Sequence, residues 1–185
     1  MAGSLIKIDE FTVSSAVASV ILGGGSSGSS SLNASIDSTY DVYMVTFNNV
    51  APATDATNLR VRFTVSGTAD SSSNYDRALK KLNAHATFGD TSSTNQDHLR
   101  TSSAGIGTNT SEIDNGILYL FNFNNASEYS FITIEETLFS SSETHSGNQG
   151  GGVLTVAQAC DGIQFLMSSS GNIASGTFKL YGLKK

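Results

Sequence analysis

The feature of this sequence that most constrains its fold is its series of short apolar runs, separated by Gly, Ser, Asn and Asp. Residues 59–65, LRVRFTV, alternate between apolar and polar or charged side chains. A period of two places successive side chains on opposite faces of a β-strand, so one face is buried and the other faces water. Short runs bounded by turn residues are typical of antiparallel sheets.

Similar runs recur along the chain. Residues 117–123 and 129–134 are apolar on both faces, so we expect them to be central strands. Residues 76–88 begin with helix formers, but their second half favours a strand. Further strands are expected at residues 4–8, 12–22, 40–50, 153–157, 162–167 and 177–181. About nine or ten strands at this spacing predict an all-β fold, a jelly-roll-like antiparallel β-sandwich.

The chain length predicts one domain. A protein of 185 residues buries about 70% of its unfolded surface, which is enough for one core without disulfides. We expect residues 1–10 to form an N-terminal arm or an edge strand, and residues 11–185 to form the sandwich. Residues 23–31, 91–111 and 140–152 are rich in Gly, Ser or other polar residues and predict long loops. Such loops are either solvated connections or segments that order against a partner.

The charge composition argues against several functions. Ten Lys and Arg residues against 16 Asp and Glu give a net charge of −6, so we expect no basic patch of useful size and no nucleic-acid binding. The single cysteine, Cys160, excludes a disulfide within the chain and is expected to be a small buried side chain. No apolar run reaches the length of a membrane span, and the N-terminus predicts no signal peptide.

No residue pattern indicates catalysis. His85, His98 and His145 lack metal-binding spacing, and no serine sits in a nucleophile elbow. Glu135 and Glu136 are adjacent, so a strand would place them on opposite faces. We therefore predict no enzyme, no catalytic residue, no cofactor and no metal site.

Calcium binding is an alternative that the acidic turns leave open. Asp90, Asp114 and Asn115 supply the oxygen atoms that calcium prefers. Turn formation is the role that we favour for these residues.

Aromatic residues leave two interpretations open. Tyr75 lies in a Ser- and Asn-rich segment that suits a recognition surface or sugar stacking, although closure of the sandwich end is favoured. The chain has no tryptophan, which argues against a carbohydrate-binding module. Phe121, Phe123, Tyr129 and Phe131 serve either the core or an oligomer interface, and the core is favoured.

Two stretches resemble a known group of proteins. Residues 39–67, TYDVYMVTFNNVAPATDATNLRVRFTVSG, contain a YDxY strand, an NVxPATD turn and an LRxRF strand, and residues 176–183 read GTFKLYGL. This pattern is similar to that of small β-rich structural proteins from tailed bacteriophages. Members of that group often continue with STDGG after the Arg strand, whereas this chain has TVSGT at residues 64–68. Residues 91–152 match nothing in the pattern.

The resemblance implies a non-enzymatic virion protein on the particle surface. Capsid decoration, in which the protein bridges capsid subunits, is favoured over a tail or fibre component, and a glycan-binding receptor module is a further alternative. The implied partners are phage capsid or tail proteins, a homo-oligomer with a trimer favoured, and in the alternative a host surface glycan. The motif residues mark strands and turns, so the resemblance carries over no functional site.

Overall fold

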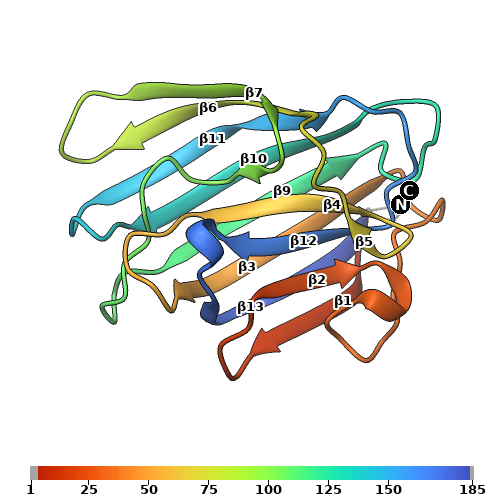
Figure 1. The fold of residues 1–185 in the computed structure, drawn as a ribbon, viewed down its shortest axis with the longest axis horizontal. Coiled ribbons are helices and arrows are strands. Elements are labelled where there is room, and N and C mark those ends of the chain that lie inside the picture. Colours follow the sequence, from red (N-terminus) through yellow and green to blue (C-terminus); the bar gives the residue numbers. More distant parts are fainter. Residues whose placement is uncertain (1–3, 184–185) are drawn as a thin grey trace.

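The computed structural model describes residues 4–183 and consists of two antiparallel β-sheets packed face to face (Figure 1). The predicted β-sandwich is therefore confirmed. The described residues form 13 strands rather than nine or ten. No helix among them is long and apolar enough to cross a membrane.

The larger sheet has eight strands in the order β1-β13-β3-β9-β10-β11-β6-β7. Their bounds are β1 Leu5–Val13, β13 Ile173–Leu183, β3 Val42–Pro52, β9 Asp114–Phe121, β10 Ser130–Phe139, β11 His145–Leu154, β6 Tyr75–Asn83 and β7 Gly89–Gln96. The smaller sheet has the order β2-β12-β4-β5, and β8 also pairs with β4. Its bounds are β2 Ser19–Gly23, β12 Gly162–Met167, β4 Leu59–Val65, β5 Thr68–Ala69 and β8 Leu99–Arg100.

The core lies between the two sheets and is built from the apolar faces of the alternating strands. Phe165 of β12 stacks at 5.9 Å from Phe47 of β3 and at 4.9 Å from Phe178 of β13, measured between ring centroids. Phe63 of β4 lies 4.4 Å from Phe123, which follows β9. The small sheet thus covers β13, β3 and β9, and its Phe63 also packs against Tyr75 at the start of β6, whereas β7 lies beyond it (Figure 1).

Two of the three predicted loops are wrong. Residues 91–111 include most of β7 and all of β8, and residues 140–152 include most of β11. Strand β11 is central, because it pairs with β10 on one side and β6 on the other. Its glycines give no alternation of apolar and polar side chains, so the sequence pattern does not predict a strand here. The strand is held by backbone hydrogen bonds with both neighbours rather than by its own side chains.

The third predicted loop, residues 23–31, contains a short 3-10 helix at Gly25–Ser27. It is fixed by the buried Asp9 side chain, whose Oδ2 accepts a hydrogen bond from the Gly23 backbone N–H at 2.9 Å. The Asp9 Oδ1 atom accepts a second bond from the Ser30 hydroxyl. An ordered polar anchor of this kind cannot be seen in a Gly- and Ser-rich run.

Strand boundaries also differ from the prediction. The strand expected at residues 12–22 is divided between the last two residues of β1 and the first four of β2, and the one expected at 76–88 ends at Asn83. The strand expected at residues 40–50 continues to Pro52, which is the last residue of β3 and lies opposite Ile173. A strand end tolerates proline because few ladder bonds need its missing N–H.

The N-terminal segment forms an edge strand. Residues 5–13 pair with β13 along their whole length, apart from one bulge between Lys7 and Asp9. The part of the expected arm at residues 1–3 lies outside the described residues, as do residues 184–185.

Candidate docking groove on the eight-stranded sheet

The outer face of the eight-stranded sheet carries a groove of about 670 Å³. Its floor is a row of small side chains that crosses four strands at right angles. In that row Thr133 of β10 faces Gly151, Gly151 faces Ala78 of β6, and Ala78 faces Ser92 of β7. The floor is low because none of these residues extends a large side chain from the sheet.

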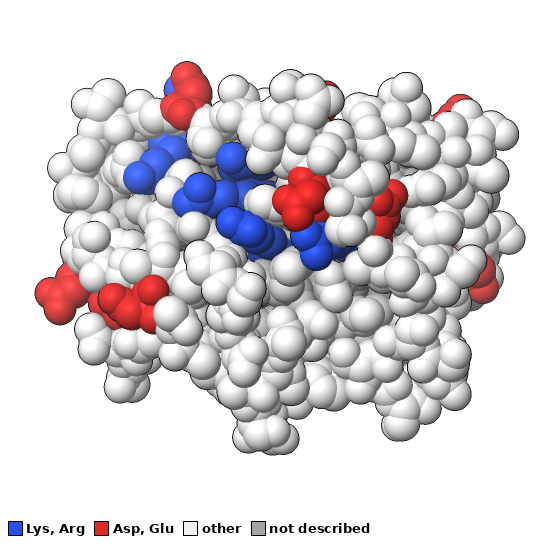
Figure 2. All heavy atoms as spheres, viewed as in Figure 1, with Lys and Arg blue, Asp and Glu red and all other residues white. Residues whose placement is uncertain are grey.

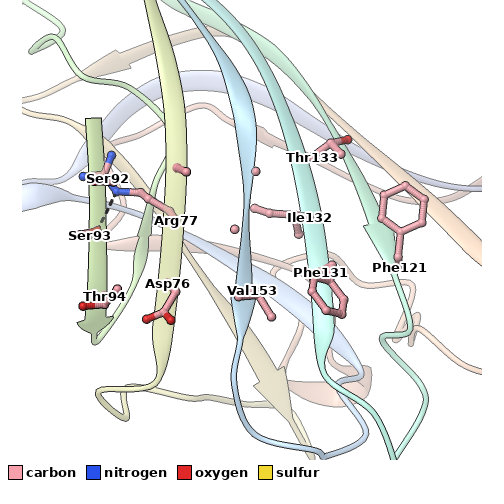
Figure 3. A pocket seen from close by; sticks show the side chains of 13 residues that line it. Asp76, Arg77, Ser92, Ser93, Thr94, Phe121, Phe131, Ile132, Thr133 and Val153 are labelled. Atoms are coloured by element: carbon pink, nitrogen blue, oxygen red, sulfur yellow. Dashed lines mark hydrogen bonds between the residues drawn. The ribbon is translucent and has the colours of Figure 1, made fainter. Parts of the chain in front are cut away.

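The groove wall on one side is apolar (Figure 3). Phe131 of β10 stands between Phe121 of β9 and Val153 of β11, and the row continues to Asp76 of β6. Phe131 is 43% exposed, which is unusual for a phenylalanine at the centre of a sheet.

The next row on the other side of the floor is polar. Glu135 and Gln149 face each other across β10 and β11, and the row ends in an ion pair of 2.8 Å between Lys80 and Asp90. The groove therefore separates an aromatic row from a charged row, a combination that presents both apolar and polar contacts to one occupant.

The glycines of β11 serve the two faces of the sheet differently. A Cβ at Gly152, on the inner face, would lie 2.5 Å from the Cδ2 of the buried Leu99. Gly151, on the outer face, leaves the groove floor open, and a Cβ there would lie 2.6 Å from the Ile132 carbonyl oxygen. Close packing on both faces of β11 thus requires glycine at these positions, although a glycine-rich segment predicts a loop from the sequence.

The aromatic residues that sequence analysis singled out divide between the core and the surface. Phe123 is buried at 2% exposure, in agreement with the favoured core role. Tyr129 and Phe131 are exposed, and Phe121 is half-buried in the groove wall. The core prediction is therefore wrong for Phe121, Tyr129 and Phe131.

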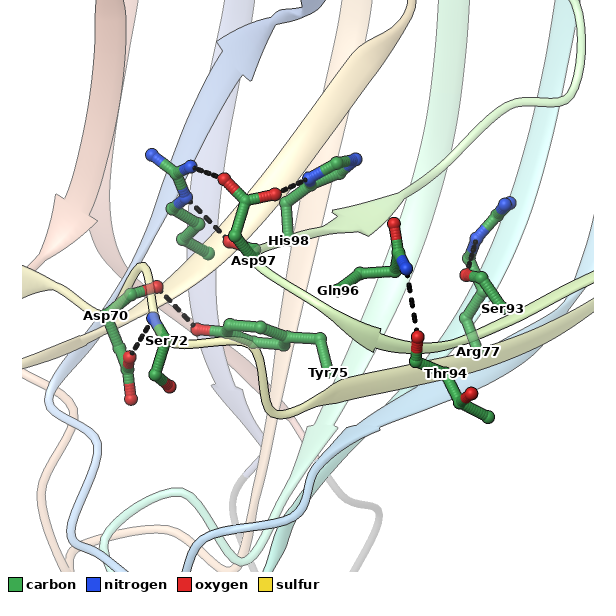
Figure 4. A network of polar contacts seen from close by, with 10 residues as sticks. Asp70, Ser72, Tyr75, Arg77, Ser93, Thr94, Gln96, Asp97 and His98 are labelled. Carbon is green, nitrogen blue, oxygen red and sulfur yellow. Dashed lines mark hydrogen bonds and ion pairs between the residues drawn. The ribbon is translucent and has the colours of Figure 1, made fainter.

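Tyr75, for which sequence analysis left a recognition surface open as an alternative, is fully buried. Its hydroxyl accepts a hydrogen bond from the Phe63 N–H at 3.0 Å. It donates one to the Asp70 carbonyl oxygen, also at 3.0 Å (Figure 4). Burial raises the pKa of the Tyr75 phenol well above its ordinary value. The residue closes one end of the sandwich, which is the role that the sequence analysis favoured, and it offers no surface for a ligand.

His98 belongs to a polar network beside β8 (Figure 4). Its Nδ1 lies 2.5 Å from Asp97 Oδ1, and the Arg62 Nε donates to the Asp97 carbonyl oxygen at 2.8 Å. Burial is the main cause that lowers the pKa of His98, against the raising effect of Asp97. The network satisfies polar groups at the edge of the small sheet. Within residues 4–183 no three His, Cys, Asp or Glu side chains gather as metal ligands would.

Asp114 and Glu136 form a buried carboxyl pair on the inner face of the large sheet. Asp114 is fully buried, and both its oxygens lack a hydrogen-bond partner in the described structure. Burial, and then the Glu136 charge, raise the pKa of Asp114 well above its ordinary value. Burial raises the pKa of Glu136 to about 7, although Asn148 donates to its Oε2 at 2.6 Å.

The carboxyl pair lies inside the sandwich, and this decides two predictions. Glu135 is exposed while Glu136 is buried, so the expected division between opposite faces is confirmed. Asp114 is buried in the sheet interior and Asp90 is ion-paired with Lys80, which argues against the calcium alternative at these residues.

Cys160 is buried as predicted, and burial raises the pKa of its thiol to about 11.

No protein-family model matches the chain, and no curated protein matches it. The groove and the polar clusters around it therefore have to be interpreted from their own geometry.

Proposed function

We propose that this chain is a non-enzymatic structural protein of a bacteriophage virion, which sits on the particle surface as capsid decoration. The observation that carries the proposal is the exposed Phe131 in the wall of the outer-face groove. Exposed aromatic side chains in a preformed hollow are typical anchors of protein interfaces. The phage assignment rests on the motif resemblance in residues 39–67 and 176–183.

The occupant that we assign to the groove is an apolar side chain or loop of a neighbouring virion subunit. The groove lining contains one carboxylate, Asp76. Arg77 also borders the groove, but its Nε donates to Ser93 on the opposite face of the sheet, so the contribution of the groove to binding is mainly apolar. The chain as a whole carries a net charge of −6, which favours a partner surface less acidic than itself.

A homotrimer completes the proposal. The edge strands β1 and β7 each leave one side unpaired in the described chain. Contacts between copies would cover these edges, which monomers must otherwise protect with charges and bulges.

A decoration role predicts a high copy number. In particles purified from the phage that encodes this chain, mass spectrometry should give a ratio to the major capsid protein of order one. A ratio far below one would instead place the protein at the tail, a fibre or a vertex. Absence from the particles would overturn the virion proposal.

The groove itself is tested by reconstitution. Particles that lack the protein are mixed with wild type, with Phe131→Ser, or with Phe139→Ser. Phe139 lies on the outer face of the same strand, is 37% exposed, and is not part of the groove lining. We expect Phe131→Ser to lose particle binding and Phe139→Ser to keep it. Equal binding by the two variants would contradict the docking role of the groove.

A glycan-binding role is a second candidate because of one observation. The exposed Phe131 ring shares the groove with the hydroxyl-bearing residues Ser92, Thr94 and Thr133. An aromatic ring beside hydroxyl groups can stack and hydrogen-bond a sugar. Saccharides should then raise the melting temperature of wild type but not of Phe131→Ser. No shift over a broad glycan panel would remove this candidate.

A further inference from the structure

All four arginines of this acidic chain lie in one cluster, at the place where β4, β6 and β8 meet. Arg60 of β4 and Arg100 of β8 are directly opposite each other in the strand pairing. Arg62 follows Arg60 on the same face of β4, and β6, which carries Arg77, contacts β8. Burial, and then the charge of Arg100, lower the pKa of Arg77. Figure 2 shows Lys and Arg side chains gathered in one band across the face that carries the small sheet. The expectation that no basic patch could form is therefore wrong.

The cluster has fewer negative charges than positive ones. Asp97 forms an ion pair with Arg62, so one of the four charges is directly compensated. Glu136 acts on Arg100 from the core, but burial keeps its pKa near 7 and leaves it only partly ionised at neutral pH. Like charges opposite each other in a sheet are destabilising, so this arrangement costs the free protein stability.

Three guanidinium nitrogens in the cluster are buried and have no hydrogen-bond partner in the described structure. They are Arg60 Nε, Arg77 Nη1 and Arg100 Nε. Buried polar atoms are nearly always hydrogen-bonded in folded proteins, and an unpaired donor on a cation is the costliest case. The arginine side chains are only half-buried, so an anion contacts their remaining guanidinium nitrogens, and its negative charge offsets the cost of leaving these three donors unpaired.

The guanidinium groups are also held in position. Arg77 Nε donates to Ser93 Oγ at 3.1 Å, and Arg100 Nη2 donates to the Ser103 carbonyl oxygen at 3.1 Å. Arg62 is fixed by Asp97. Each arginine has five N–H donors, so these contacts orient the side chain and leave most donors available. Half-buried, oriented guanidinium groups bind oxyanions well because little side-chain entropy is lost on binding.

From this geometry we propose that the arginine cluster is a binding site for a phosphate-class oxyanion, either free or carried on a sugar. The anion accepts hydrogen bonds from Arg60, Arg77 and Arg100, while Arg62 supplies a further positive charge. Bidentate contacts between guanidinium groups and a tetrahedral oxyanion are among the strongest hydrogen bonds that proteins make. The site is separate from the groove and does not depend on the virion role.

Arginine side-chain NMR tests the site with inorganic phosphate at low ionic strength. We expect the Nε–Hε signals of Arg60, Arg77 and Arg100 to shift together and to saturate in the millimolar range. Arg60→Gln should weaken binding about 10-fold, the loss expected for one charge-assisted contact, and Arg60→Gln/Arg100→Gln should abolish it. Lys80→Gln is the matched control, because Lys80 lies on the opposite face of β6 and should bind phosphate as wild type does.

Glucose 6-phosphate and glucose distinguish the two sources of the oxyanion. Tighter binding of glucose 6-phosphate than of phosphate would assign the site to a sugar phosphate, and equal binding would assign it to the free ion. Glucose alone should not bind.

Two results would overturn the proposal. The first is no saturation by phosphate up to about 50 mM, because such an affinity would be weaker than the affinity that a few charge-assisted contacts supply. The second is binding of a single-stranded oligonucleotide without any response to phosphate, which would indicate an extended polyanion surface. Variants are compared only after circular dichroism shows a wild-type fold. Phosphate should raise the melting temperature of wild type and of Lys80→Gln, but not that of Arg60→Gln/Arg100→Gln.

Discussion

The two sides of strand β6 present opposite chemistry, although they come from the same nine residues. On the outer side Ala78 forms part of an uncharged groove floor beside an exposed aromatic row. On the inner side Arg77 joins three other arginines, and Leu79 is buried in the core. Because successive side chains of a strand point to opposite faces, one segment can contribute to two unrelated surfaces, and the neighbouring strands determine the chemistry of each surface.

The largest effect should come from opening the core on the inner side of β6. Leu79→Ala removes a side chain that is 4% exposed and should lower the free energy of unfolding by about 2–5 kcal/mol. Ala78→Leu, one residue away on the outer face, is the control and should change it by less than about 0.5 kcal/mol. Chemical denaturation measures both, and equal losses would contradict the assignment of the two faces.

Adding a methyl group to the inner face of β11 should have the next largest effect. Gly152→Ala places a Cβ against Leu99 in the core and should destabilise the protein by about 1–3 kcal/mol. Gly89→Ala, at the start of β7, is the control, because a Cβ there would meet no atom within 4 Å. If the two melting temperatures fall equally, Leu99 does not pack as described.

The buried carboxyl pair makes the inner face sensitive to pH. The pKa of Asp114 is raised on folding and that of Glu136 is raised to about 7. Protonation of these two carboxyl groups therefore stabilises the folded protein relative to the unfolded one. Stability should therefore be highest below the ordinary carboxyl pKa and should fall as the pH rises from about 4 to about 7. Thermal melts across this range measure the trend.

Asp114→Asn should remove part of that pH dependence. The variant should be more stable than wild type at pH 8, by about 1–3 kcal/mol, because it has no buried acid to keep protonated. The gain should vanish below about pH 3, where Asp114 is mostly neutral in both folded and unfolded wild type. A gain that stays constant with pH would show that the raised pKa is not its cause.

The smallest effect should be a gain from relieving the arginine cluster. Without phosphate and at low salt, Arg60→Gln should raise the free energy of unfolding by about 0.2–1 kcal/mol, because it removes one of two like charges that face each other. The same change should weaken phosphate binding. A loss of stability in salt-free buffer would show that Arg60 serves the fold rather than a ligand.

The amino-acid sequence was sufficient for the fold class and for the strands with clear alternation. Leu59–Val65 and Gly162–Met167 have the predicted bounds, because apolar residues at a period of two can only bury one face of a strand. The central position expected for the apolar runs in β9 and β10 also holds. The prediction that Cys160 is buried rests on the same preference of small apolar side chains.

Only the tertiary structure decided the two candidate sites. The groove depends on β11, a glycine-rich strand whose position comes from backbone pairing with β10 and β6 and leaves almost no hydrophobic signal. The arginine cluster unites residues from three strands that lie up to 40 positions apart in sequence, from Arg60 to Arg100. A composition with a net charge of −6 hides such a cluster, because charge counts carry no information on which side chains the fold brings together.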